Sequence, residues 1–163
     1  MKKVNLLIFI VLLLSNQRIL YSQTKSLLKK YKIYKIEEWS VIDKNNPELK
    51  NTEVYDENGK IIEKITYGKN KKPKKREEYK YDSTNLLIEH LIYNDKNIIT
   101  KHEILRYNNN KQKIEKIELN QSGKIISKTI YEYDENTGFL ITKKIYDEKN
   151  NLEKVISYKY FEK

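Results

Sequence analysis

The chain has 163 residues, and its 33 Lys and Arg against 23 Asp and Glu give a formal net charge of +10. It contains no Cys, which excludes disulfides, thiolate zinc sites and a cysteine nucleophile, and its two His are too few for a three-His metal site. Four Gly leave no glycine-rich phosphate loop, and 14 Tyr against 3 Phe and 1 Trp favour β-structure.

Residues 1–22 have the layout of a secretory signal peptide. Lys2 and Lys3 precede a mostly apolar run at 4–14, and a more polar stretch then leads to Ser22. The apolar run is shorter than the roughly 20 residues that span a bilayer. We therefore expect cleavage after Ser22, giving an exported protein, periplasmic or secreted, that does not span the membrane. An uncleaved N-terminal anchor helix is the alternative.

The rest of the chain divides into a lead-in at 23–31, with one short helical turn, and a β-repeat domain at 32–163. Tyrosines mark a regular interval in this domain, because 26 residues separate each of the first three major tyrosines from the next and 27 separate the last pair. These tyrosines are Tyr55, Tyr81, Tyr107, Tyr133 and Tyr160. Polar clusters rich in Asp, Asn and Gly follow them and recur midway between them, and these residue types favour turns.

The runs between the polar clusters are rich in Ile, Tyr and Thr and have the length of strands. Because the turns are short, consecutive strands must be antiparallel neighbours. The sequence therefore predicts an all-β fold: an antiparallel meander of about ten strands, built from 26-residue double-strand repeats as a single curved sheet or open barrel. The strands are expected near 32–42, 48–55, 60–67, 72–81, 86–93, 98–107, 112–119, 124–133, 139–146 and 151–160.

The Tyr-Asp pairs carry a resemblance to a known family. The segments YDENGKI at 55–61, YKYD at 79–82 and YEYD at 131–134 resemble the YD repeat of Rhs-type extracellular proteins, and short MORN-like β-repeats look similar. The resemblance implies β-hairpin strips associated with cell-surface binding or with encapsulation of a toxin. Tyr107 departs from the pattern because Asn108 follows it. Each Asp is expected to cap its turn while the Tyr packs on the sheet.

The two histidines flank the predicted turn at 94–97. If that turn is centred between Asp95 and Lys96, Glu89 lies opposite His102, close enough to touch. A Glu–His pair is compatible with a weak metal site or an acid–base pair, but no third ligand or orienting group is signalled. We expect an ordinary cross-strand ion pair, no metal or cofactor, no catalytic residue and no enzymatic activity.

A run of positive charges interrupts the pattern after Gly68. It is a candidate polyanion-binding segment for acidic glycans or lipid headgroups, and nucleic acid is not expected for an exported protein. The alternative is a solvated loop whose lysines discourage sheet aggregation. The candidate residues are Lys69, Lys71, Lys72, Lys74, Lys75 and Arg76.

The tyrosines offer a second candidate surface, because Tyr gives amphipathic contact area at low entropic cost. The candidates are Tyr79, Tyr81, Tyr131, Tyr133, Tyr158 and Tyr160. The expected function is an exported, non-enzymatic binding or scaffold module at the bacterial cell envelope, with a glycan or protein partner there. Two alternatives are an immunity- or antitoxin-like partner of a secreted toxin and a periplasmic carrier of an apolar ligand.

Overall fold

The computed structural model describes residues 25–40 and 47–161. The predicted signal peptide and its cleavage site lie outside the described residues. Within them the protein forms ten strands and one short 3₁₀ turn, η1 (Lys69–Lys71). The strands are β1 (Lys35–Ser40), β2 (Glu48–Tyr55), β3 (Ile61–Tyr67), β4 (Pro73–Tyr81), β5 (Leu87–Asn94), β6 (Ile99–Tyr107), β7 (Lys113–Leu119), β8 (Ile125–Tyr133), β9 (Leu140–Tyr146) and β10 (Leu152–Ser157).

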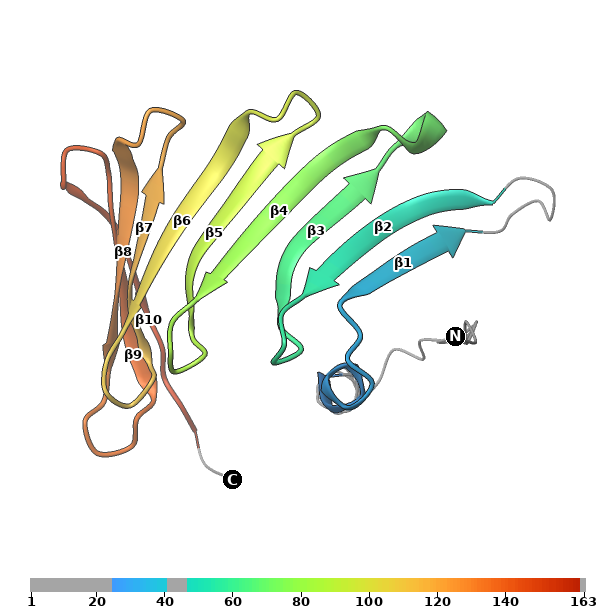
Figure 1. Ribbon diagram of the computed structural model, residues 1–163. Helices are drawn as coiled ribbons and strands as arrows, with labels where there is room; N and C mark the ends of the chain where they lie inside the picture. The colour runs from blue at the N-terminus through green and yellow to red at the C-terminus, as the bar shows by residue number, and fades with distance from the viewer. Residues whose placement is uncertain (1–24, 41–46, 162–163) are drawn as a thin grey trace.

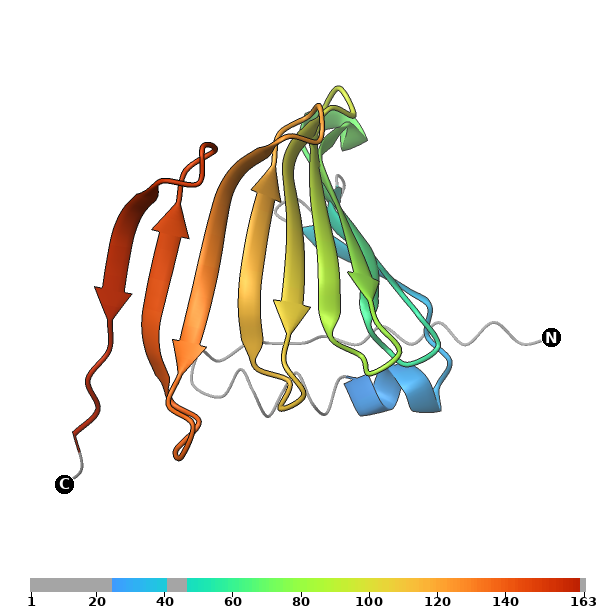
Figure 2. The same ribbon diagram turned by 90° about the vertical axis from the view of Figure 1, so that its left-hand side faces the viewer.

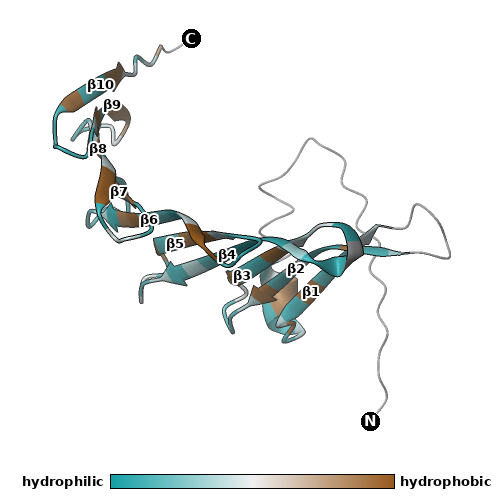
Figure 3. Cartoon of the chain, turned by 90° about the horizontal axis from the view of Figure 1, so that it is seen from above, coloured by the Kyte–Doolittle hydropathy of each residue, from teal (hydrophilic) through white to brown (hydrophobic). Residues whose placement is uncertain are grey.

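All ten strands belong to one sheet, in which each strand pairs with the next in the chain (Figure 1). Every pairing is antiparallel. Seen from above, the strands follow a single curved line with no second layer of sheet (Figure 3). The predicted ten-strand meander is confirmed as a single curved sheet. It is not closed into a barrel, because β1 and β10 remain separate edges.

The turns explain why the strand ends could be predicted from the sequence. In the first such turn, the Asp56 carboxylate accepts backbone N–H groups from Asn58 and Lys60, at 2.9 and 2.8 Å, while Gly59 takes a φ of +71°. An Asp or Asn side chain thus closes a short loop whose fourth residue needs positive φ. The same arrangement recurs at Asp82/Asn85, Asn94/Asn97, Asn120/Gly123 and Asp147/Asn150.

The hydroxyl groups of the major tyrosines join the two strands of a hairpin at its open end, away from the turn. The hydroxyl of Tyr81 donates to the carbonyl of Ile61, twenty residues earlier and on the adjacent strand, at 2.9 Å. Tyr107, Tyr133 and Tyr160 make the equivalent bonds to Leu87, Lys113 and Leu140. Each bond joins the end of one strand, or the residues just after it, to the start of the strand before. These bonds therefore hold together the open ends of successive hairpins. We call Tyr81, Tyr107, Tyr133 and Tyr160 the clasping tyrosines.

Substitution of these tyrosines should have nearly equal effects on stability. We expect Tyr107→Ala and Tyr133→Ala each to lower the free energy of unfolding by about 1–3 kcal/mol. The corresponding Phe variants should lose about 0.5–1.5 kcal/mol, because only the hydroxyl hydrogen bond disappears. Urea denaturation checks both series. A Phe variant as stable as the parent would show that the hydroxyl hydrogen bond contributes nothing to stability.

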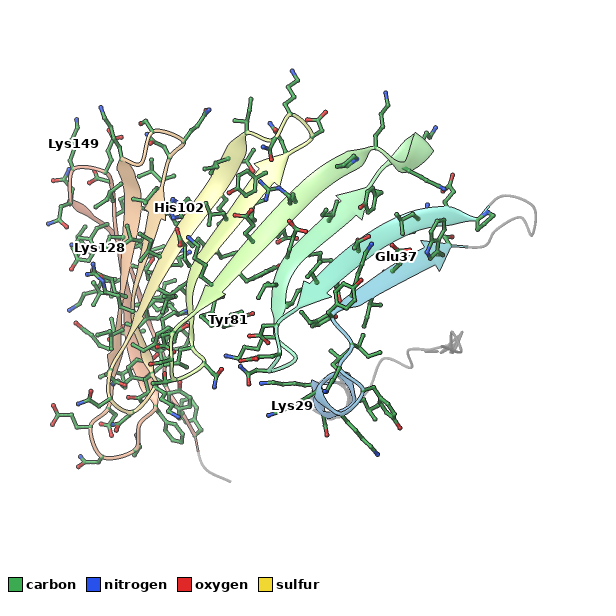
Figure 4. All side chains as sticks on the ribbon, in the orientation of Figure 1. Lys29, Glu37, Tyr81, His102, Lys128 and Lys149 are labelled. Carbon is green, nitrogen blue, oxygen red and sulfur yellow. The ribbon has the colours of Figure 1, made fainter. Side chains whose placement is uncertain are left out.

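The sheet has two faces, which the strand registers define. Face A carries Glu77, His90 and Glu103, which lie side by side on β4, β5 and β6. Face B carries Leu91 and Ile117, the two buried apolar side chains of the described strands. Both faces also carry charged residues, as the side chains projecting from the two sides of the ribbon show (Figure 4). The core is therefore thin, and most side chains keep some contact with solvent.

A helical segment at 25–30 packs beneath the β2–β3 turn, where the sequence predicts a helical turn (Figure 1). Its Leu28 is 6% exposed. A Cβ on Gly59 would lie 3.0 Å from the Lys25 carbonyl and 3.6 Å from the Leu28 Cβ, so only glycine allows this close approach. None of the helical residues in the described part of the chain forms a helix long and apolar enough to cross a membrane.

Candidate functional site

Face A carries a row of apolar and aromatic side chains that runs across the strands. Alternation within the strands places one of them on each strand from β3 to β9, and Tyr158 follows just after β10. Its four isoleucines are 36–39% exposed, so this row is presented to solvent rather than packed into a core. The members are Ile62, Tyr79, Ile88, Leu105, Ile114, Tyr131, Ile141 and Tyr158.

Beside this row on face A lies a chain of alternating acidic and basic side chains, which we call the ion ladder. Its centre is His90, whose Nε2 lies 3.1 Å from Glu77 and whose Nδ1 lies 3.3 Å from Glu103. Glu103 also accepts from Lys116 at 3.2 Å, and Lys116 contacts Glu118. The remaining members, Glu53 and Lys64, are paired on β2 and β3 at 2.8 Å.

The contacts of the ion ladder lower the pKa of Glu103 and of Glu77. Burial alone would raise the pKa of Glu103, but hydrogen bonds from Lys101, Lys116 and His90 outweigh it and lower that pKa to about 2. Burial also opposes ionisation of Glu77, yet Lys75 and His90 bring its pKa below the usual value. Because each carboxylate is already paired, the ladder acts as a cross-strand brace.

On β7 to β10 the lysines lie beside tyrosine rings instead of carboxylates, and the two residue types alternate from strand to strand. The Lys113 ammonium lies 4.7 Å from the centre of the Tyr131 ring. Lys143, directly opposite Tyr131 in the register, lies 5.7 Å from that ring and 5.2 Å from the ring of Tyr158. We call these four residues the Tyr/Lys row. Within the described part of the chain, neither lysine has an ion pair with a carboxylate.

The predicted tyrosine surface divides into two places. Tyr131, Tyr133, Tyr158 and Tyr160 lie on or just beyond β8 to β10, and Tyr160 stacks on Phe139 with ring centres 4.7 Å apart.

Tyr79 and Tyr81 lie on β4, several strands away. Tyr79 stacks on His90 at 4.6 Å and donates to Glu77, so internal contacts engage it. Burial and the adjacent Glu77 raise its pKa. The structure therefore brings four of the six predicted tyrosines together.

The predicted polyanion segment is divided between η1 and the beginning of β4. Lys75 pairs with Glu77 at 2.8 Å on face A. On the other face, Arg76 contacts Glu78, lies over the Tyr93 ring at 3.8 Å and donates to Asn97 at 2.8 Å. These two cations are thus committed to contacts within the sheet. The other members, Lys71 over the Trp39 ring and the exposed Lys69, Lys72 and Lys74, lie at the end of the sheet away from the clasping tyrosines.

The predicted contact between Glu89 and His102 exists, but the predicted register is wrong. His102 Nε2 lies 2.7 Å from Glu89, although His102 is paired with Leu91 and the contact is diagonal. The pairing differs from the predicted one by two positions, since Glu89 lies opposite Ile104, and a bulge of one residue between Ile92 and Tyr93 accounts for one of them. Among the described residues, no three His, Asp or Glu side chains are grouped to hold a metal ion.

Sequence reasoning did not single out Lys113 and Lys143. Lys143 follows Tyr131 by twelve residues across one turn, so a correct register would have placed it opposite that tyrosine. Lys113 was harder to find, because a bulge between Arg106 and Tyr107 displaces the pairing at the start of β7. The spacing that brings these lysines to the tyrosines is present in the sequence, but β-bulges change the register and make it hard to read from the sequence alone.

Comparison with known proteins does not assign the chain to a family. No protein-family model matches the chain, and no curated protein matches it. Among solved structures, one described as "Crystal Structure of TarM" aligns with a TM-score of 0.32 and 15% sequence identity. The alignment covers 80% of this chain and 24% of the TarM chain. A TM-score of this size carries no argument about either fold or activity.

Proposed function

We infer that this protein is a non-enzymatic binding module of the cell envelope that holds an extended partner against face A. The observation that carries this inference is the Tyr/Lys row, in which Tyr131, Lys143 and Tyr158 lie on face A. Lys113, at the bulge that begins β7, extends its ammonium to the Tyr131 ring, and neither lysine is paired with a carboxylate among the described residues. Tyrosines beside cations are typical of recognition surfaces, because their rings give contact area at low entropic cost.

The remaining chemistry of face A supports binding over catalysis. The one histidine flanked by two carboxylates, His90, belongs to the ion ladder and is also covered by the stacked Tyr79 ring. A general acid or base needs access to a substrate proton, and these groups are instead occupied with one another. The ladder therefore supports the sheet that presents the Tyr/Lys row.

Location and repeat character are parts of the same proposal. The signal-like sequence at 1–22 would export the chain, and the 26-residue tyrosine interval would make it a YD-like repeat protein. The equivalent hydroxyl bonds of Tyr81, Tyr107 and Tyr133 are consistent with such a repeat. A repeat that forms a strip of sheet suits the presentation of a long surface.

Binding to washed envelope material from the producing cell tests the proposed function. We expect the Tyr131→Leu/Tyr158→Leu double variant of the purified protein to be retained at least about tenfold less than the parent, because about 1.4 kcal/mol corresponds to tenfold. Tyr146→Leu is the matched control, since Tyr146 lies on face B under Lys128 at 5.1 Å. Circular dichroism should be unchanged in both. Equal retention of the double variant would contradict the proposal.

A further inference from the structure

The Tyr/Lys row alternates strictly from strand to strand. Lys113 begins β7, Tyr131 lies on β8, Lys143 on β9, and Tyr158 follows β10. The backbone N–H of Tyr158 bonds to the Ile141 carbonyl at 2.9 Å, so Tyr158 still pairs with β9, two residues along from Ile156, which lies opposite Lys143. Because neighbouring strands lie about 4.8 Å apart, like groups are about 9.6 Å apart across the sheet, and Tyr158 has a further offset of two residues along its strand.

The row also lacks anions of its own. Lys116, also on β7, is paired with Glu103 and Glu118, whereas Lys113 and Lys143 lie by tyrosine rings and have no carboxylate partner in the described part of the chain. A hydrogen bond with Tyr158 raises the pKa of Lys143, which keeps it charged. Face A of β8 to β10 contributes Lys143 and Lys154 but no acidic side chain. This end of the face therefore complements negative charge.

We propose that the Tyr/Lys row binds a linear acidic polysaccharide that crosses β7 to β10. This inference rests on the proposed function and names its ligand class. The apolar faces of the sugar rings stack on Tyr131 and Tyr158, and carboxylates carried by the sugars pair with Lys113 and Lys143. Sugar units of an extended chain repeat on the scale of the strand spacing, so ring and charge recur in step with the row.

The equivalent position nearer the N-terminus shows why binding is confined to this end of the sheet. Tyr79 corresponds to Tyr131 two tyrosine intervals earlier, but it is stacked on His90 and bonded to Glu77. Glu77 places a negative charge beside the ring, where an acidic ligand would be repelled. At the intermediate position face A carries Leu105, which offers no aromatic ring. The ligand site thus spans β7 to β10.

Titration calorimetry with oligogalacturonates of graded length tests the proposal. Affinity should rise with length until the oligomer spans from Lys113 to Tyr158, at least about 14 Å across three strand spacings, and then level off. Lys143→Gln should weaken binding at least about tenfold. Lys128→Gln is the matched control, because Lys128 lies over Tyr146 on face B of the same strand pair, β8 and β9, and its loss should leave affinity unchanged.

Two further probes separate the ligand class from charge alone. Cello-oligosaccharides of the same length, which are neutral, and polyglutamate, which is acidic without sugar rings, should both bind at least about tenfold more weakly. Equal affinity for either probe, or equal loss in Lys128→Gln, would overturn the inference. If oligogalacturonates fail while envelope retention still depends on Tyr131 and Tyr158, the ligand class is wrong and the proposed function stands.

Discussion

Replacing Glu103 with Gln is expected to lower the free energy of unfolding by about 2 kcal/mol at pH 7. Glu103 accepts bonds from His90, Lys101 and Lys116 and is 13% exposed, so its loss leaves three donors without their charged acceptor. Hydrogen bonds to charged groups contribute about 1.5–3 kcal/mol, and residual solvent access keeps the effect near the lower half of that range. Urea denaturation measures the difference.

The same substitution should change the pH dependence of stability. The folded-state pKa of Glu103 is about 2, below the ordinary value of 4.5, so folding favours the ionised form. Its contribution is therefore complete above the unfolded-state pKa and is lost as the pH falls toward the folded-state value. The gap in stability between the parent and Glu103→Gln should shrink progressively from about pH 4.5 down to about pH 2.

The control is Glu115→Gln, which removes an ion pair with Arg106, whose side chain is 63% exposed. A surface pair of this kind contributes about 0–1 kcal/mol, so this variant should lose little stability. A Glu103→Gln variant no less stable than Glu115→Gln would show that the ion ladder does not brace the sheet.

The second large loss of stability is expected from a substitution in the thin core. Ile117→Ala should lower the free energy of unfolding by about 2–3 kcal/mol, because Ile117 is 8% exposed on face B and its removal leaves a cavity. Ile114 lies on the same strand but on face A, where it is 37% exposed. Ile114→Ala should cost about 1 kcal/mol or less, mainly through the lower strand propensity of Ala.

Because both isoleucines belong to β7, the pair controls for position in the chain. Thermal and urea denaturation of the two variants give the comparison. If Ile114→Ala destabilised the protein as much as Ile117→Ala, face A would be packed in solution rather than presented. Its apolar row would then be unavailable to a ligand.

The strands were predictable because each turn has its own local chemistry. Asp56 and Asn58-Gly59 determine where β2 ends and β3 begins without help from the rest of the chain. The first strand is less well marked: it begins at Lys35, three residues later than expected, because the preceding residues extend from the docked helix. Local sequence defines turns well and defines the entry into the sheet poorly.

Register and contacts between strands were harder to predict. The bulge between Ile92 and Tyr93 adds a residue to one strand, which moves His90 opposite Glu103 and leaves Glu89 beside His102 only diagonally. The ion ladder was invisible for this reason, since its members are brought together by bulges. The Tyr/Lys row was missed likewise, although Tyr131 and Tyr158 were both predicted as surface residues.

Lysine footprinting tests most directly whether face A is the binding surface. The purified protein, free or bound to washed envelope material, is acetylated briefly, and the rate at each lysine is read by mass spectrometry. We predict that binding protects Lys113 and Lys143, while Lys128 and Lys149, which lie elsewhere at the C-terminal end of the sheet, react as before (Figures 2 and 4). Protection of Lys69, Lys71, Lys72 and Lys74 with unchanged Lys113 and Lys143 would contradict the account and place binding on the basic segment instead.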